Sequence, residues 1–116
     1  TMFTLKERIE FIKGVVQDDK KIKVMSYDGL TIDFCEKVKA KFIVRGVRNT
    51  GDFEFEKAIA RTNRFLSRIE TIFILTSAKT SFISSSIVRD LINNNGEYSK
   101  LVPKSISDFV LKNHSK

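Results

Sequence analysis

Two short, uninterrupted apolar runs constrain the fold of this chain more than any other feature of its sequence. Residues 42–46 (FIVRG) and 70–77 (ETIFILTS) have the length and composition of buried strands in a parallel sheet that is covered on both faces. Between them, residues 52–66 carry apolar side chains at helical spacing. In parallel sheets a strand, a helix and a second strand are joined by a right-handed crossover. The sequence therefore predicts an α/β protein built on a parallel sheet.

Further periodic segments extend this alternation of helices and strands. Residues 5–16 are a predicted helix that follows Thr4 and Glu7, which have the spacing of a capping box. Residues 22–29 are a predicted strand that ends in an Asp-Gly turn. Asp52 is the predicted cap of the helix between the two apolar runs. The remaining predicted helices are residues 30–40, 84–95 and 105–111.

The whole pattern indicates a three-layer, Rossmann-like parallel sheet with helices on both faces. It begins with a helix, so the first strand of such a sheet is missing from the chain. In open α/β sheets ligands bind beyond the carboxyl ends of the strands, and the first strand-to-helix loop commonly holds phosphates. The chain has no such first loop, and the candidate ligand residues lie at later strand ends.

Composition narrows the class of protein. A chain of 116 residues with 41% hydrophobic content can form one compact domain, residues 1–116. The net charge of +7 favours anionic partners, but it does not separate nucleic acids from nucleotides or phosphates. No run is long enough to span a membrane and no signal-peptide pattern opens the chain, so we expect a soluble, intracellular protein.

Few residues offer nucleophilic or metal chemistry. The single cysteine, Cys35, excludes an internal disulfide framework and is predicted to be a buried, inert thiol. His114, the only histidine, lies in a polar tail and is predicted to be solvated. The lysines at 20, 21 and 23 are predicted to form a solvated turn. Neither a catalytic triad nor a Cys/His metal motif can be assembled.

Arg45 and Arg48 lie at the carboxyl end of the first apolar run, where a ligand crevice is expected. Their guanidinium groups can donate paired hydrogen bonds to phosphate oxygens. Gly46 between them allows a sharp turn or a close approach of ligand to backbone. The alternative is that both arginines form ordinary surface ion pairs with acidic residues of the next helix, namely Asp52, Glu54 or Glu56.

Two other groups of polar residues could join such a site. Glu56, Ala60, Asn63 and Ser67 form a polar stripe on the helix after the arginines. Glu56 could accept hydrogen bonds from a ligand ribose or amine, or it could neutralise the arginines. The serines at 84–86 follow the last strand and enter a helix, so they could bind an anion, or one of them could simply cap the helix.

Three segments, "IVRGVRNTGDFEFE", "TSFISSSIVRDL" and "LVPKSI", occur here in the order and at the separations found in the bacterial phosphopantetheine adenylyltransferases. The chain resembles this family of nucleotidyltransferases over essentially all of its length, as the carboxyl-terminal three-quarters of the family domain. The resemblance implies transfer of an adenylyl group from ATP to 4'-phosphopantetheine, with Mg²⁺, to give dephospho-coenzyme A and pyrophosphate. This is a step of coenzyme A biosynthesis.

The resemblance also assigns site residues. It implies that Thr31, Arg45 and Asn63 bind the phosphopantetheine substrate. The positions that it assigns to ATP binding are Gly46, Val47, Arg48, Glu56, Thr80, Ser81, Phe82, Ile83, Ser84, Ser85 and Ser86. Thr80 departs from the family, whose members often have an aromatic residue there, and threonine has no ring that could stack on adenine.

The family signature Gly-Thr-Phe-Asp-Pro with His-x-Gly-His and a following lysine would lie ahead of Thr1. Its histidine and lysine are the expected catalytic residues, so we expect this chain alone to have little adenylyl transfer activity. The implied mechanism is in-line attack of the acceptor phosphate on the α-phosphorus of ATP, helped by alignment and charge neutralisation.

The resemblance further implies a cytoplasmic homohexamer, with coenzyme A as a feedback ligand and without nucleic acid or membrane partners. Three alternatives remain. A related adenylyltransferase could act on another phosphorylated acceptor, and a basic nucleic-acid-binding module would lose affinity steeply with salt. If the protein is purely structural, Arg45→Ala and Arg48→Ala will have no effect on ligand binding.

Overall fold

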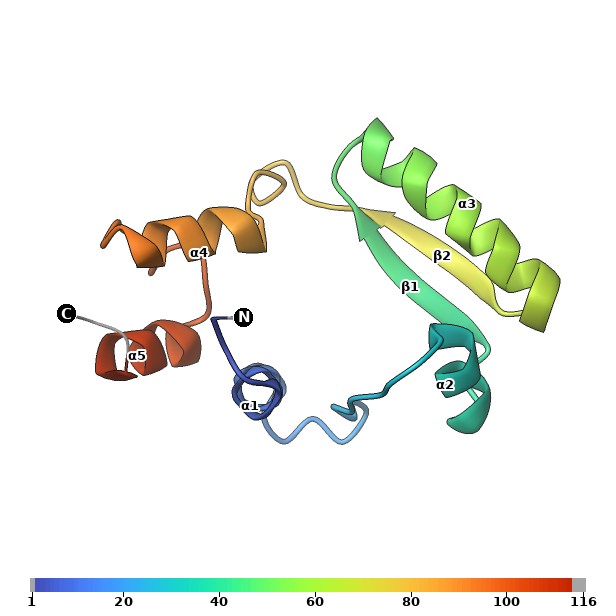
Figure 1. Cartoon of the computed structure of the whole chain (residues 1–116), viewed down its shortest axis with the longest axis horizontal. Coiled ribbons are helices and arrows are strands. Elements are labelled where there is room, and N and C mark those ends of the chain that lie inside the picture. Colours follow the sequence, from blue (N-terminus) through green and yellow to red (C-terminus); the bar gives the residue numbers. More distant parts are fainter. Residues whose placement is uncertain (1, 114–116) are drawn as a thin grey trace. The chain divides into compact units, whose positions relative to one another are not determined.

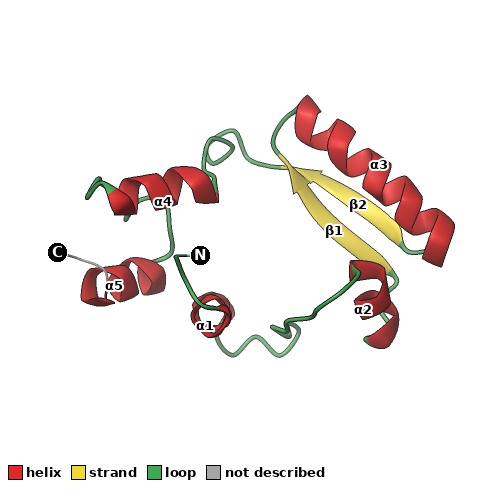
Figure 2. Cartoon of the chain, viewed as in Figure 1, coloured by secondary structure: helices red, strands yellow, loops and turns green. Residues whose placement is uncertain are grey.

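The computed structural model describes residues 2–113, which divide into two compact units. The sheet unit, residues 27–82, contains α2 (Thr31–Lys37), β1 (Phe42–Val47), α3 (Thr50–Ser67) and β2 (Glu70–Leu75). The helical unit, formed by the described residues up to Ser26 and from Ile83, contains α1 (Leu5–Val16), α4 (Ser85–Asn93) and α5 (Lys104–Asn113) (Figures 1 and 2). The description of residues 1–116 as one domain stays a prediction.

The sheet unit confirms the predicted α/β class and the parallel sheet. β1 and β2 pair in parallel, with Phe42 opposite Glu70 and Val47 opposite Leu75. α3 connects the two strands and packs on one sheet face (Figure 2). On this face the ring of Phe53 meets the ring of Phe73 edge-on, with the centroids 5.2 Å apart. The register places the carboxyl ends of both strands side by side, which positions the residues that follow them at one edge.

A small apolar core lies near the amino ends of the strands. Ile32 and Cys35 of α2 are buried together with Ile69, and Ala40 and Ile43 pack against them. Burial of the Cys35 thiol was predicted, and it is confirmed at 6% exposure. The core anchors α2 beside the start of β1, which fixes where the first turn of α2 can place its side chains.

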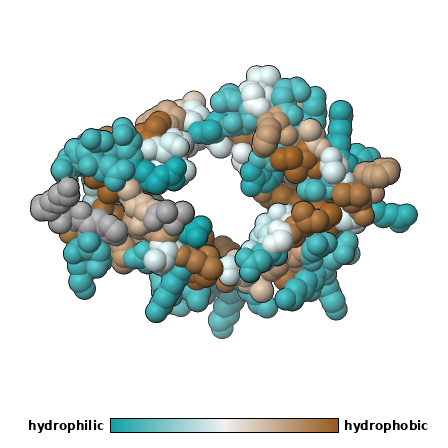
Figure 3. Space-filling model, in the orientation of Figure 1, coloured by the Kyte–Doolittle hydropathy of each residue, from teal (hydrophilic) through white to brown (hydrophobic). Residues whose placement is uncertain are grey.

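Within the sheet unit itself, the described helices α2 and α3 do not cover the opposite sheet face. Phe42 and Val44 of β1 and Ile72 and Ile74 of β2 share this face and are 46–60% exposed. Apolar residues are accordingly visible at the surface of the sheet unit, at the right of Figure 3. An apolar run shows that a strand is suited to burial. Whether its face is buried depends on another segment that packs on it.

The predicted strand at residues 22–29 is wrong. Among the described residues β1 and β2 pair only with each other, and 22–29 form neither a strand nor a bridge. A strand exists through hydrogen bonds to a neighbour, so a suitable local sequence is insufficient without one.

Two helix starts test the capping predictions. At α1 the Thr4 hydroxyl accepts from Glu7 N–H at 3.1 Å and the Glu7 carboxylate accepts from Thr4 N–H at 2.9 Å, which confirms the capping box. The cap of α3 is Asn49 and not Asp52, since Asn49 Oδ1 accepts from Asp52 N–H at 2.8 Å. The helix thus begins three residues earlier than predicted, and the Asp52 carboxylate stays available for another partner.

The helical unit is held by aromatic contacts between α1 and α5. The ring of Phe11 lies 5.1 Å from that of Phe3 and 5.0 Å from that of Phe109, edge-on in both cases.

The predicted helices at 84–95 and 105–111 are confirmed as α4 and α5. The lysines at 20, 21 and 23 are exposed, as predicted, while His114 lies outside the described residues. None of the described helices combines the length and hydrophobicity that crossing a bilayer requires.

Candidate functional site

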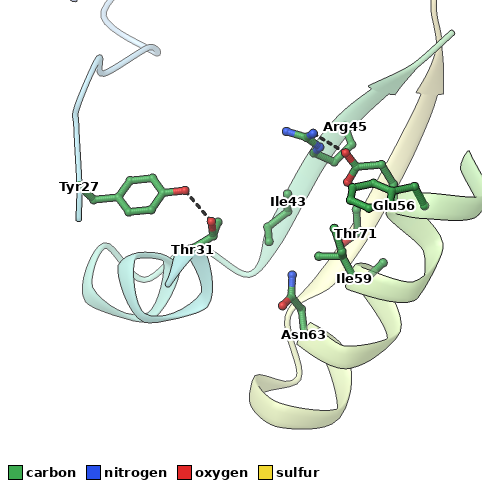
Figure 4. Close-up of a pocket in the computed structure, with 10 residues that line it drawn as sticks. Tyr27, Thr31, Ile43, Arg45, Glu56, Ile59, Asn63 and Thr71 are labelled. Carbon is green, nitrogen blue, oxygen red and sulfur yellow. Dashed lines mark hydrogen bonds and ion pairs between the residues drawn. The ribbon is translucent and has the colours of Figure 1, made fainter. Parts of the chain in front are cut away.

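A pocket of about 300 Å³ lies in the sheet unit on the face that α3 covers. Its walls come from α2 and the segment before it, from β1 and β2, and from α3 (Figure 4). The lining residues are Tyr27, Thr31, Ile43, Arg45, Phe55, Glu56, Ile59, Ala60, Asn63 and Thr71. The register explains part of this lining, because Ile43 and Thr71 are partners on the two strands and project to the same side. We call this cavity the acceptor pocket.

Arg45 is the cationic group of the acceptor pocket. Its Nη2 atom donates to Oε1 of Glu56, eleven residues on and inside α3 (Figure 4). The Arg45 side chain is 52% exposed, whereas that of Glu56 is 17% exposed. The hydrogen bond to Glu56 raises the pKa of Arg45, partial burial opposes this, and the charges of Glu56 and Tyr27 add to the increase. Arg45 is therefore a permanent cation, and its guanidinium has further N–H donors for an anion.

Arg48 makes the second ion pair of this edge. Its Nε and its backbone N–H both donate to Oδ2 of Asp52, at 3.1 and 3.0 Å. These two bonds, the side-chain bond first, lower the pKa of Asp52. The alternative of surface ion pairs is thus realised for both arginines, and neither pairing prevents an anion from binding the remaining donors.

A second cavity, of about 290 Å³, adjoins the acceptor pocket. It is lined by Arg45, Gly46, Arg48, Gly51, Asp52, Phe55 and Glu56. Arg45, Phe55 and Glu56 line both cavities, so the ion pair between Arg45 and Glu56 stands where the two meet. We call this second cavity the arginine pocket.

Gly46 has room for a Cβ atom beside Thr76. A Cβ atom built on Gly46 would lie 3.5 Å from Cγ2 of Thr76, an ordinary van der Waals distance. The fold therefore does not require glycine here, and any need for one would come from a ligand that approaches the backbone.

Oγ1 of Thr76 is buried and has no hydrogen-bond partner among the described residues, which is unusual for a buried hydroxyl.

The structure brings together many of the predicted site residues. Thr31, Arg45, Asn63 and Glu56 line the acceptor pocket, and Gly46 and Arg48 line the arginine pocket. Val47 is buried, and its carbonyl oxygen accepts from Thr76 N–H at 3.0 Å. The roles of these residues toward a ligand stay predictions.

The predicted loop at residues 80–86 is divided between the two units. Thr80, Ser81 and Phe82 follow β2 in the sheet unit, and residues 83–86 belong to the helical unit. Ser84 caps α4, since its Oγ accepts from Ile87 N–H at 3.2 Å, and Oγ of Ser86 accepts from the Arg89 side chain at 3.4 Å. Capping by one serine, the simpler of the two expectations, is therefore realised.

Sequence reasoning missed several lining residues, above all Tyr27. Ile43, Phe55, Ile59 and Thr71 looked like ordinary core positions of a strand or helix. Tyr27 gave one usable signal, a polar aromatic residue directly before the Asp-Gly turn.

The described residues contain no group of three or more His, Cys, Asp or Glu side chains that could hold a metal ion. The two carboxylates nearest the pockets, those of Asp52 and Glu56, are each paired with an arginine. These residues do not form a protein cage for Mg²⁺, and an ion brought by nucleotide phosphates would need few protein ligands.

Comparisons with known proteins bear on this geometry. Residues 1–91 match the profile of the cytidylyltransferase-like family. The chain is 63% identical over 105 residues to the phosphopantetheine adenylyltransferase of Flavobacterium psychrophilum, covering 90% of this chain and 70% of that protein. It is 60% identical to the protein of the same name from Flavobacterium johnsoniae, covering 90% and 69%.

A more distant relative gives the same result. The phosphopantetheine adenylyltransferase of Lachnoclostridium phytofermentans is 44% identical over 110 residues, which cover 94% of this chain and 68% of that protein. The resemblance seen in the three sequence segments is thereby confirmed. The chain belongs to the cytidylyltransferase-like family of nucleotidyltransferases, with the phosphopantetheine adenylyltransferases as its relatives.

Proposed function

We propose that this chain belongs to an enzyme that transfers the adenylyl group of ATP to 4'-phosphopantetheine, giving dephospho-coenzyme A and pyrophosphate. The observation that carries this proposal is the position of Arg45 between two adjoining pockets. A transferase for two phosphorylated substrates must hold both phosphates close together while keeping the bodies of the substrates apart.

The acceptor pocket fits the chemistry of 4'-phosphopantetheine. Arg45 supplies a cation for the phosphate group, and Ile43, Ile59 and Ala60 supply apolar walls for the dimethyl-bearing part of the arm. Asn63 and Thr31 supply polar side chains for the two amides of the arm.

The arginine pocket fits a nucleotide polyphosphate. Arg48 adds a second guanidinium, and Gly46 leaves room for a phosphate or ribose beside the backbone. Glu56 can accept hydrogen bonds from ribose hydroxyls, at the cost of its bond to Arg45.

The reaction needs no covalent enzyme intermediate. An acceptor phosphate oxygen bonds to the α-phosphorus of ATP, the bond from that phosphorus to the bridging oxygen breaks, and pyrophosphate leaves with this oxygen. Arg45 holds the attacking phosphate and Arg48 offsets charge on the leaving group. Both act by alignment and charge neutralisation.

Finer points belong to the same proposal. Mg²⁺ is proposed only as the companion of the ATP phosphates, where it would neutralise charge. Coenzyme A contains the phosphopantetheine arm, so it is proposed as a competing ligand of the acceptor pocket. A homohexamer in the cytoplasm is proposed on the basis of the resemblance, and sedimentation velocity of the purified protein tests the assembly.

Calorimetric titration with 4'-phosphopantetheine tests the proposal. Arg45→Ala should weaken binding by about tenfold or more, because a hydrogen bond to a charged group contributes about 1.5–3 kcal/mol. Arg61→Ala is the matched control, since Arg61 is an exposed arginine of α3 outside both pockets. Absence of binding, or equal losses in the two variants, would contradict the proposal.

An acceptor other than phosphopantetheine is the second candidate, because a single arginine recognises any phosphomonoester. Competition separates the two candidates. Glycerol 3-phosphate should displace 4'-phosphopantetheine only at far higher concentration if the arm contributes to binding. Adenylyl transfer itself is measured with each acceptor in turn.

A further inference from the structure

One wall of the acceptor pocket carries two hydroxyl groups, those of Tyr27 and Thr31. Only Thr31 has so far been assigned to ligand binding. Tyr27 Oη and Thr31 Oγ1 lie 2.5 Å apart and share a hydrogen bond, and both residues line the pocket. Figure 4 shows this pair extending from the α2 side, with the Arg45 guanidinium reaching from β1 on the other side of the cavity. The pocket therefore has a cationic side and a hydroxyl side.

The Tyr27 side chain is held in place before any ligand binds. Its ring stacks on that of Phe34 in α2, with the centroids 4.5 Å apart and the planes at 12°. Its hydroxyl is tied to Thr31, the first residue of the same helix. Because the ring and the hydroxyl are both fixed, a ligand that contacts Tyr27 pays little additional ordering entropy.

The hydroxyl pair has unused hydrogen-bonding capacity. Each hydroxyl has one donor, and the bond between Tyr27 and Thr31 uses only one of the two. Within residues 2–113 neither hydroxyl has another partner, and the side-chain amide of Asn63, on α3, is also unpaired. One hydroxyl donor and one carboxamide thus face a half-apolar cavity, an arrangement that suits an amide group of a ligand.

We propose that Tyr27 is a positioning residue that determines acceptor specificity: paired with Thr31, its hydroxyl presents a hydrogen-bond donor to an amide carbonyl of the acceptor arm, opposite the phosphate held by Arg45. This inference rests on the proposed function and adds a residue to it. A site built to hydrogen-bond a ligand group discriminates against ligands that lack the group, since its own polar atoms are then left unpaired.

Tyr27→Phe tests the proposal, because it removes one oxygen and keeps the ring that stacks on Phe34. Binding of 4'-phosphopantetheine should weaken by about three- to tenfold, the loss typical of one neutral hydrogen bond. Binding of glycerol 3-phosphate, which has a phosphate but no amide arm, should not change. Tyr98→Phe is the matched control, since Tyr98 is the other tyrosine of the chain and lies in the helical unit.

Two further measurements separate positioning from a merely structural role. Thr31→Val alone should weaken 4'-phosphopantetheine binding as much as Thr31→Val combined with Tyr27→Phe does, because the two hydroxyls act as one unit. A structural role would weaken both ligands together and lower the melting temperature, which would overturn the proposal.

The outcomes also separate this inference from the proposed function. If Tyr27→Phe binds 4'-phosphopantetheine as well as the unchanged protein does, while Arg45→Ala does not, the role of Tyr27 is refuted and the function stands. If the unchanged protein fails to bind 4'-phosphopantetheine, both are refuted.

Discussion

The ion pair between Arg45 and Glu56 leads to the prediction with the clearest sign. In the ligand-free protein the Glu56 carboxylate occupies one edge of the guanidinium that the acceptor phosphate is proposed to bind. The phosphate must therefore compete with a like charge. Glu56→Gln removes the negative charge and keeps a carbonyl oxygen that can accept the hydrogen bond.

The size of the expected change in acceptor affinity follows from the solvent exposure of the ion pair. Two unit charges about 4 Å apart interact by about 4 kcal/mol at an effective dielectric constant of 20. Arg45 is 52% exposed, so solvent and salt screen this interaction to about 1 kcal/mol. Glu56→Gln should thus tighten 4'-phosphopantetheine binding about fivefold. ATP binding should weaken, because Glu56 is the proposed acceptor for its ribose.

Calorimetric titration of each substrate separately measures the two opposite changes. Glu54→Gln is the matched control, since Glu54 lies in the same helix, pairs with Lys57 and lines neither pocket. Added salt should reduce the gain in acceptor affinity. If Glu56→Gln weakens acceptor binding, Glu56 mainly orients Arg45 for the phosphate, and the competition argument is refuted.

Three other predictions concern residues around the pockets. Thr76→Val should raise the free energy of unfolding by about 1 kcal/mol in urea titrations, because it removes a buried hydroxyl oxygen without a partner among the described residues; a loss of stability would reveal a hidden partner. Gly46→Ala should leave that free energy nearly unchanged, since the added Cβ would lie 3.5 Å from Thr76, while ATP titrations should show weaker binding; a large loss of stability would contradict the observed space. The pKa of Asp52 is lowered from 3.8 by Arg48, so this pair stabilises the fold above that value and the contribution is lost as pH falls through the lower, folded-state pKa. Asp52→Asn should therefore lower stability at neutral pH but much less at a pH below the folded-state pKa of Asp52, and an equal loss at both pH values would contradict the sign.

Local sequence signals were sufficient for most of the secondary structure. The helix at 5–16 was predicted from the spacing of Thr4 and Glu7, and both hydrogen bonds of that capping box are present. The apolar runs at 42–46 and 70–77 predicted two strands, and the structure has them at 42–47 and 70–75. Such features depend on residues within a few positions of each other, so their physical cause can be read along the chain.

Two predictions failed for different reasons. Residues 22–29 have a strand-like sequence but no neighbouring strand among the described residues, and such a partner is not encoded locally. The predicted cap of α3 was wrong although its cause is local. Asn49 and Asp52 both have side chains suited to capping, and in the structure Asn49 caps α3 while Asp52 binds Arg48.

The same division applies to the pockets. The sequence by itself determined that Arg45 would stand at the carboxyl end of a strand, because an apolar run ends there, and its family could be recognised from short motifs. Only the tertiary structure decided that Glu56 would pair with it, that two cavities would share this pair, and that Tyr27 would face it from the segment before α2. These groups converge from separate elements, and their convergence depends on strand register and helix packing, which no single segment of the chain encodes.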